Sequence, residues 1–171
     1  LGLISLGLQP GETVGIIGEN TPELFWADFA TLAAGAKMVC LYPDMTPDEM
    51  RYVLQHAEAI FLVAEDQEQV DKVVEVRDRI PKVNRVIYED PRGMRDYRAD
   101  DWFMFIEDLY KEGDAVHQER PEAFEAFVDE KGALALLDAM RFADKHRDRL
   151  SEYFTDPDVG LVARQLPELE K

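Results

Sequence analysis

Residues 13–40 read TVGIIGENTPELFWADFATLAAGAKMVC, and this stretch contains one complete strand–helix–strand unit. The run TVGIIG at 13–18 is short, apolar and bounded by Gly and Asn, as expected of a strand that is buried on both faces. The TPE that begins at Thr21 predicts a helix start, because it supplies a hydroxyl N-cap, a proline at the first helical position and an acid in the first turn. We expect this helix to end at Gly35 and a second strand to occupy 38–41.

The same alternation continues toward the C-terminus. A second hydroxyl–proline–acid start, TPDE at 46–49, predicts a helix that runs to about Glu58. It is followed by a predicted strand at 59–64, an amphipathic helix from Gln67 to about Ile80, and a strand from Val83 to Tyr88. Strands that alternate with helices in this way are typical of βαβ units. The predicted fold class is therefore α/β, with a mainly parallel sheet and flanking helices.

The inward face of the first complete helix is predicted from its apolar residues. They are Leu24, Phe25, Phe29, Leu32 and Ala33.

The ends of the chain follow a different pattern. The apolar residues from Leu1 to Leu8 resemble the tail of a helix already under way, so the sequence looks cut at its N-terminus. Residues 102–106 fit either a strand or the apolar start of a helix. Beyond them we expect a helical C-terminal segment, with helices that start at Glu119-Arg120-Pro121 (carrying Phe124 and Phe127), at Ala133 and at Val159.

The composition limits the classes of partner. The chain has 171 residues, 46% hydrophobic and 32% charged, which suits one globular domain. Its formal net charge of −17 argues against nucleic acid or an anionic membrane surface as a partner, because both would be repelled. No apolar stretch is long enough for an integral membrane span, and no signal peptide is visible, so the expected location is cytoplasmic.

Residue types that often carry chemistry are sparse. Cys40 is the only cysteine, which excludes an internal disulfide, and its apolar surroundings predict a small buried hydrophobe rather than a nucleophile. His56, His117 and His146 are far apart in sequence and do not form a metal-binding pattern. We expect His56 at the surface, near a helix end where a cation suits the helix dipole.

Other groups of residues have structural explanations. Gly15 and Gly18 loosely resemble a dinucleotide fingerprint, but a third glycine is missing and Glu19 would lie where a pyrophosphate binds, so we interpret them as turn glycines. The acidic run at 65–68 is expected to charge a helix N-terminus. Aromatic residues that one could imagine in an acyl pocket are interpreted as core: Phe103, Phe105, Phe124 and Phe127.

Residues 6 to about 127 resemble the adenylate-forming superfamily, specifically its long-chain fatty acyl-CoA synthetase branch. LQPGETVGIIGEN at 8–20 is similar to that family's entry strand, and LAAGAKMVCLYP at 32–43 to its helix-to-strand turn. TPDEMRYVLQHAE at 46–58 is similar to the helix in which many synthetases read S-x-E-E-L-x-Y-x-L-x-H-S-E. The resemblance implies an AMP-forming acyl-CoA synthetase, which in its intact form uses ATP, Mg²⁺ and coenzyme A.

The family's chemical motifs are missing from this sequence. Its phosphate loop is rich in Ser, Thr and Gly and ends in Pro-Lys-Gly, because clustered amides and hydroxyls are needed to hold a triphosphate. Here the only serines are Ser5 and Ser151, the threonines are scattered, and Lys131-Gly132 has no hydroxyls upstream. The magnesium segment, the ribose-binding aspartate and the catalytic lysine are absent as well. We therefore expect no catalytic, cofactor-binding or metal-binding residues in this chain, no cofactor bound by it, and no activity alone.

These observations predict a partial AMP-binding domain at 1–128 and a helical extension of unknown origin at 129–171. The mixed charges of the extension fit an ordinary helix with a solvated face; alternatively, the segment replaces the family's continuation through internal deletion, frameshift or splicing. The expected partner is the remainder of a synthetase. A second hypothesis is a stand-alone acidic α/β module that binds or regulates without catalysis. A third, a small flavodoxin-like domain, is weakened by the absence of a phosphate-binding loop.

Overall fold

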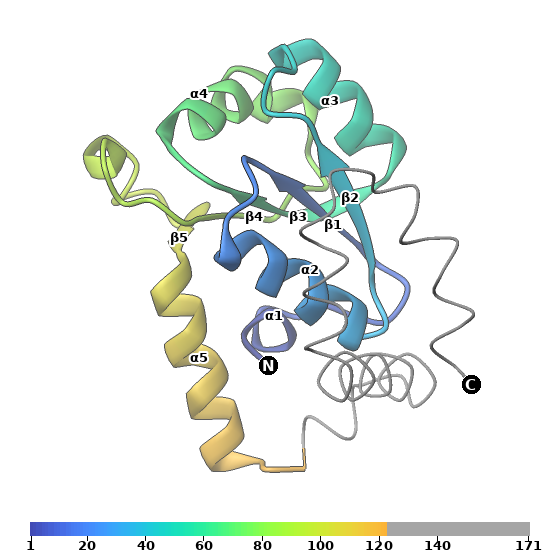
Figure 1. The fold of residues 1–171 in the computed structure, drawn as a ribbon, viewed down its shortest axis with the longest axis vertical. Helices are drawn as coiled ribbons and strands as arrows, with labels where there is room; N and C mark the ends of the chain where they lie inside the picture. The colour runs from blue at the N-terminus through green and yellow to red at the C-terminus, as the bar shows by residue number, and fades with distance from the viewer. Residues whose placement is uncertain (123–171) are drawn as a thin grey trace, which may run out of the picture. The chain divides into compact units, whose positions relative to one another are not determined.

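The sheet has five strands that are all parallel (Figure 1). The computed structural model describes residues 1–122, which belong to one compact unit. The strand order is β2-β1-β3-β4-β5. The strands are β1 Thr13–Ile17, β2 Lys37–Leu41, β3 Ala59–Ala64, β4 Arg85–Tyr88 and β5 Phe103–Phe105. The α/β prediction with a mainly parallel sheet is confirmed.

Helices cover both faces of the sheet. In Figure 1, α3 and α4 lie on one face, and α1, α2 and α5 lie on the other. The helices are α1 Gly2–Ser5, α2 Pro22–Ala33, α3 Pro47–His56, α4 Gln67–Val76 and α5 Ile106–Glu119, with 3₁₀ turns at Arg77–Arg79 and Met94–Asp96. The segment at 102–106, for which both interpretations were open, contains a strand and the first residue of a helix.

Alternating residues of the central strands supply two apolar cores. Leu62 and Val86 pack under α3 and α4, whereas Val63 and Ile87 pack under α1, α2 and α5. Gly15 faces α3, where an added Cβ would lie 2.8 Å from Leu54 Cδ2. Glycine at this point of β1 therefore lets α3 approach the sheet closely.

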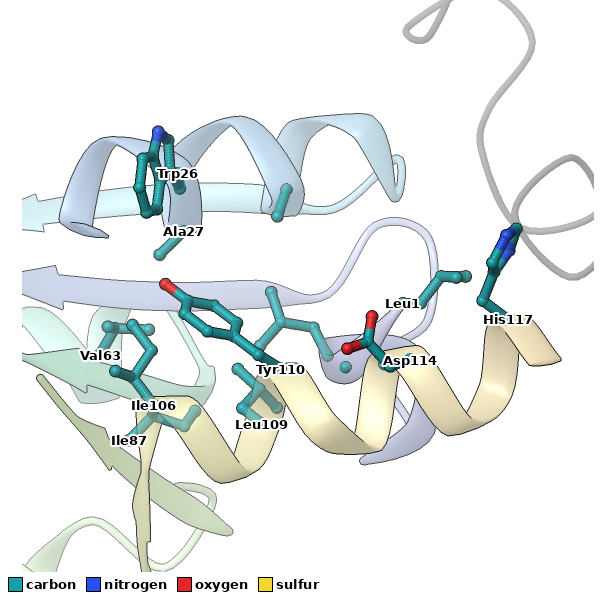
Figure 2. Close-up of a pocket in the computed structure, with 14 residues that line it drawn as sticks. Leu1, Trp26, Ala27, Val63, Ile87, Ile106, Leu109, Tyr110, Asp114 and His117 are labelled. Carbon is teal, nitrogen blue, oxygen red and sulfur yellow. The ribbon is translucent and has the colours of Figure 1, made fainter. Parts of the chain in front are cut away.

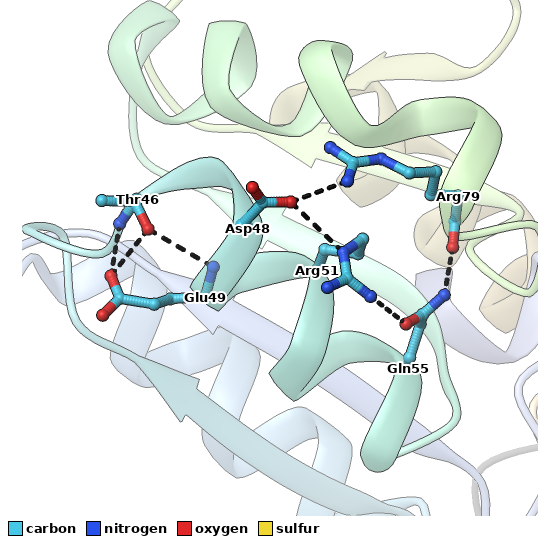
Figure 3. A network of polar contacts seen from close by, with 6 residues as sticks. All are labelled: Thr46, Asp48, Glu49, Arg51, Gln55 and Arg79. Carbon is cyan, nitrogen blue, oxygen red and sulfur yellow. Dashed lines mark hydrogen bonds and ion pairs between the residues drawn. The ribbon is translucent and has the colours of Figure 1, made fainter.

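The two hydroxyl–proline–acid motifs start helices as predicted. Thr21 Oγ1 accepts a hydrogen bond of 3.3 Å from the amide of Leu24, and Thr46 forms a capping box with Glu49. Figure 3 shows the capping box beside Asp48, which pairs with Arg79 at 2.7 Å and so connects the start of α3 to the turn after α4. Local capping thus fixes the starts of α2 and α3, the helices of the first two crossovers.

The predicted inward face of α2 is wrong in three of its five residues. Phe25, Phe29 and Leu32 are 50%, 47% and 43% exposed, whereas Leu24 and Thr31 are buried against the sheet. The helix carries apolar side chains on nearly every side, so its hydrophobic periodicity does not distinguish the inward face from the outward one. The outward face keeps a contiguous apolar stripe.

The prediction that Cys40 is buried is also wrong. Cys40 is an exposed residue near the end of the edge strand β2. His56, the last residue of α3, is exposed as predicted and stacks on Tyr52 with ring centroids 5.8 Å apart.

The other predictions for the chain ends have different outcomes. The N-terminal apolar run forms the short α1, which packs on α5, so that an added Cβ on Gly2 would lie 2.3 Å from the carbonyl oxygen of Leu109. The predicted helix start at Glu119-Arg120-Pro121 falls where α5 ends, with Glu119 as its last residue and Arg120 as its C-cap. Phe124 and Phe127 lie outside the described residues, as do the helices predicted to begin at Ala133 and at Val159 and the 128/129 boundary. That domain division stays a prediction.

Candidate functional site

The strand order reverses direction between β1 and β3. The chain moves from β1 outward to β2, and then crosses back to place β3 on the other side of β1. In open α/β sheets, ligands bind outside the carboxyl ends of the strands at such a reversal. The loops after β1, β3 and β4 therefore form the first candidate site.

A carboxylate occupies the loop after β1. Glu65, which follows β3, accepts a hydrogen bond of 2.6 Å from the amide of Glu19. Gly18 has φ +152°, and a Cβ added to it would lie 2.5 Å from the Cβ of Glu65. The interpretation of Gly18 as a turn glycine fits this close approach. Gly15, by contrast, lies in the middle of β1 and not at the strand–helix junction.

Further carboxylates gather beside it. Thr21 Oγ1 donates a hydrogen bond of 2.6 Å to Glu89 Oε2, just after β4. Burial raises the pKa of the Glu89 carboxyl most, the hydrogen bond from Thr21 opposes this, and repulsion from Glu23 and Glu65 raises it further. The cluster is therefore a group of acids that repel one another at neutral pH.

This edge of the sheet is poorly suited to phosphate. The Glu19 amide, which would have to face an anion, already donates to a carboxylate, and Glu23, Glu65 and Glu89 surround the same place. Within residues 1–122, no group of three or more His, Cys, Asp or Glu side chains has an arrangement suited to a metal ion. A triphosphate at this position would meet the negative charge of these acids.

A second candidate is the apolar groove between α2 and α5, which has a volume of about 500 Å³. Figure 2 shows Trp26 and Ala27 of α2 on one side and Tyr110 of α5 on the other, over the sheet residues Val63 and Ile87. Burial raises the pKa of the Tyr110 phenol, and the nearby Glu23, Glu89 and Glu107 raise it further. Asp114 and His117 lie toward the end of the groove near Leu1 (Figure 2).

A third candidate is a smaller cleft of about 280 Å³ between α2 and the end of β2. Its walls include Phe25 and Asp28 from α2 and Cys40 and Tyr42 from the β2 side. Burial raises the pKa of the Asp28 carboxyl. Burial and the neighbouring Asp28 also raise the pKa of the Cys40 thiol, which disfavours the reactive thiolate.

The match to a protein-family model covers residues 1–124 of the chain, under the description "AMP-binding enzyme". The chain belongs to the AMP-binding enzyme family. The resemblance to adenylate-forming synthetases that the strand and turn motifs indicated is confirmed.

Two relatives within the AMP-binding enzyme family are both named long-chain-fatty-acid–CoA ligases. The chain is 38% identical over 90 residues to the long-chain-fatty-acid–CoA ligase ACSBG2 of Xenopus laevis. The aligned region covers 52% of this chain and 12% of that protein. The chain is 39% identical over 87 residues to the long-chain-fatty-acid–CoA ligase FadD15 of Mycobacterium tuberculosis, covering 51% and 14%. The chain thus spans only a small part of the length of these relatives.

The solved structure of acetoacetyl-CoA synthetase from Streptomyces lividans is similar to the chain with a TM-score of 0.55 and 27% identity, over 63% of this chain and 17% of that one. The structure of a putative long-chain-fatty-acid CoA ligase from Rhodopseudomonas palustris is similar with a TM-score of 0.54 and 23% identity, over 63% and 25%. The second likeness concerns the fold alone. Together with the family match, these structures identify the sheet as part of an adenylate-forming N-terminal domain.

The structure places the residues singled out from this AMP-binding family sequence in separate regions. Phe103 is buried and packs on Trp102 and Tyr97, as the core interpretation predicts. His56 and His117 lie on α3 and α5, on opposite faces of the sheet. None of the helices among residues 1–122 is both long and apolar enough to cross a membrane.

Sequence reasoning missed most of the residues that line these candidates. Of the acidic run at 65–68, Asp66 does cap α4, by accepting from the amide of Gln69, but Glu65 instead contacts the loop after β1. Glu65 and Glu89 each follow a predicted buried strand, and the shared edge of parallel strands was a signal that could have brought them together. Trp26, Asp28 and Tyr110 belong to no sequence motif that could have indicated their place in these sites.

Proposed function

We propose that this chain supplies the early scaffold of the adenylation domain of an AMP-forming long-chain fatty acid–CoA ligase, and that residues 1–171 alone do not adenylate a carboxylate. Family membership and the names of the relatives support the first half of this proposal. Residues 1–128 would be the partial AMP-binding domain and 129–171 a separate extension.

The observation that carries the second half is the occupation of the sheet's carboxyl edge by acids. Glu65 already holds the Glu19 amide, and Glu89 is repelled by its acidic neighbours, so a triphosphate approaching this edge meets negative charge. The sequence also has no loop rich in Ser, Thr and Gly that ends in Pro-Lys-Gly. Phosphoryl chemistry depends on positioning and charge neutralisation, and these residues provide neither.

The intact family implies ATP, Mg²⁺ and coenzyme A, which would be held by segments other than residues 1–122. The role left to this chain is structural: its two apolar cores hold five parallel strands in order, against which the rest of a synthetase would pack. The corresponding partner is that remainder, and the corresponding location is the cytoplasm.

The test is ATP–pyrophosphate exchange with purified chain, Mg²⁺ and a long-chain fatty acid, with FadD15 from Mycobacterium tuberculosis assayed in parallel as the reference ligase. We expect exchange by the reference and none above background by the chain. Calorimetry with MgATP should likewise detect no saturable binding. Robust exchange by the chain, or nucleotide held at a defined place, would refute the proposal.

A second candidate function is a stand-alone acidic module that binds or regulates without catalysis. The groove between α2 and α5 favours it, because an apolar cavity of about 500 Å³ is within the range of small-molecule sites. A chain that purifies as a stable monomer and binds a synthetase would support this alternative. A chain that aggregates through its open sheet edges would support the scaffold.

A further inference from the structure

The groove between α2 and α5 combines an aromatic rim with an apolar lining. Ala27 and Ala30 follow Trp26 along α2, and their short side chains leave the space of about 500 Å³ open between the two helices. The groove is wide enough for a small molecule. Apolar side chains from α1 and α5 line it, among them Leu3, Ile106 and Leu109.

The two aromatic rings at the rim keep free surface. Trp26 is 57% exposed and Tyr110 is 41% exposed, and Figure 2 shows them on opposite sides of the groove. The face of an aromatic ring carries partial negative charge and attracts cations. The other tryptophan of the chain already has such a partner, since the guanidinium carbon of Arg77 lies 4.4 Å from the centroid of the Trp102 ring. Trp26 and Tyr110 therefore present ring surface to a cation from outside.

Acidic side chains make this rim negative. Glu23 lies three residues before Trp26, and so on the same side of α2. Burial raises the pKa of the Tyr110 phenol, and three neighbouring carboxylates raise it further. These carboxylates belong to Glu23, Glu89 and Glu107. No lysine or arginine is among the described residues that line the groove, so the charge of the rim is not balanced there.

The rings and the acids together select the charge of a ligand. An anionic amphiphile such as a fatty acid would bring a further negative charge to the acids near Tyr110 and be repelled. A cation gains from the rings and from the acids, and its apolar part removes groove surface from water. The terminal amine of Leu1 does not fill this role, because Leu1 lies near His117, at the end of the groove away from Trp26 (Figure 2).

We propose that the groove between α2 and α5 binds an organic cation with an apolar body, such as a quaternary or protonated amine on an alkyl chain. The positive group would lie at the rim formed by Trp26 and Tyr110, and the alkyl chain along the apolar lining. The site consists only of described residues of this chain. It therefore does not rest on the role of the chain as the scaffold of a ligase.

The test is isothermal titration calorimetry of the full 171-residue chain at physiological salt. The first probe is hexanol with a trimethylammonium group at the far end of its chain. The matched probe carries a tert-butyl group there, which keeps the shape and removes the charge. We expect the cation to bind at one site about tenfold more tightly than its match, as for a cation on a partly desolvated ring. Octanoate, the anionic probe, should show no saturable binding.

Two pairs of variants localise the effect. Trp26→Leu should remove most of the preference for the cation, whereas Tyr52→Leu removes an exposed aromatic ring from α3, on the other face of the sheet, and should keep it. Glu23→Gln should weaken binding of the cation about threefold, in the range of one exposed charge. Glu75→Gln removes the same charge from an exposed position on α4 and should have no such effect. Thermal melts establish that all four variants are folded.

Five results would overturn the proposal. They are no saturable binding of the cation, equal binding of the cation and its tert-butyl match, octanoate bound as tightly as the cation, an unchanged preference in Trp26→Leu, and equal effects of Glu23→Gln and Glu75→Gln. None of these readouts involves ATP, so a failure here differs from the pyrophosphate exchange that would refute the proposed function.

Discussion

Tyr97 shows how a single side chain connects two elements in this fold. Its phenol donates a hydrogen bond to Asp71 on α4, and its ring packs on Phe103 of β5 with centroids 5.0 Å apart. The hydrogen bond to Asp71 and burial raise the pKa of Tyr97 to about 12. The contact therefore joins β5 to α4.

Replacing this tyrosine with phenylalanine should lower the free energy of unfolding at pH 7 by about 0.5–1 kcal/mol, the net value of a partly solvated hydrogen bond. An unfolded tyrosine loses its proton near pH 10, whereas folded Tyr97 keeps it to about pH 12. The stabilisation is thus complete below pH 10 and is lost as the pH rises from 10 to 12.

Urea unfolding of wild type and Tyr97→Phe at pH 7, 10 and 12 measures this difference. The gap between the two proteins should close across the upper interval. Tyr52→Phe is the matched control, because that side chain is 63% exposed and should show no gap. A gap that stayed constant to pH 12 would contradict the assignment.

At the scale of the element, α3 depends on its capping box. Glu49 Oε2 accepts from the amide and hydroxyl of Thr46 at 2.9 and 2.8 Å, and the Glu49 amide donates back to that hydroxyl (Figure 3). These hydrogen bonds from Thr46 lower the pKa of the Glu49 carboxyl. Their contribution to stability is therefore present at neutral pH and is lost as the pH falls through that lowered pKa.

Thr46→Ala should cost about 1 kcal/mol of unfolding free energy at pH 7, because the first turn of α3 loses its hydroxyl partner. Thr46→Ser should restore most of the loss, since serine keeps the hydroxyl. Chemical denaturation monitored by far-ultraviolet circular dichroism measures both. An alanine variant as stable as wild type would mean that tertiary packing alone holds the helix start.

The starts of α2 and α3 could be predicted because each depends on a few adjacent residues. The inward face of α2 could not, since Phe25 and Leu24 are equally apolar and only the sheet determines which one is buried. The sequence indicated that Glu19 and Glu65 lie at the same edge of the sheet, but not that they contact each other, because periodicity identifies strands and does not give their order. The placement of Trp26 and Tyr110 on one groove is a property of packing and leaves no trace in the sequence.

At the scale of the whole molecule, the exposed apolar stripe on α2 is the surface through which copies of the chain would most readily associate. The double change Phe25→Ser and Phe29→Ser should reduce binding of the dye ANS and reduce self-association, because it removes apolar area that water already contacts. It should leave the melting temperature nearly unchanged, since both side chains are about half exposed.

Phe103→Ser is the contrasting variant, because Phe103 is buried and its loss should cost about 3 kcal/mol or more. Dye fluorescence, light scattering and thermal melts of the three proteins provide the comparison. A fall of several degrees in the double variant would show that the stripe is part of the core after all.

The strand order has a consequence for the chain while it is being made on the ribosome. β1 acquires β2 as its first neighbour, but its other neighbour, β3, is encoded only after α3. Until that segment emerges, one side of the buried strand β1 stays open to any passing strand. Nascent chains of this protein should accordingly engage chaperones most strongly when residues up to 41 have emerged from the ribosome but residues 59–64 have not.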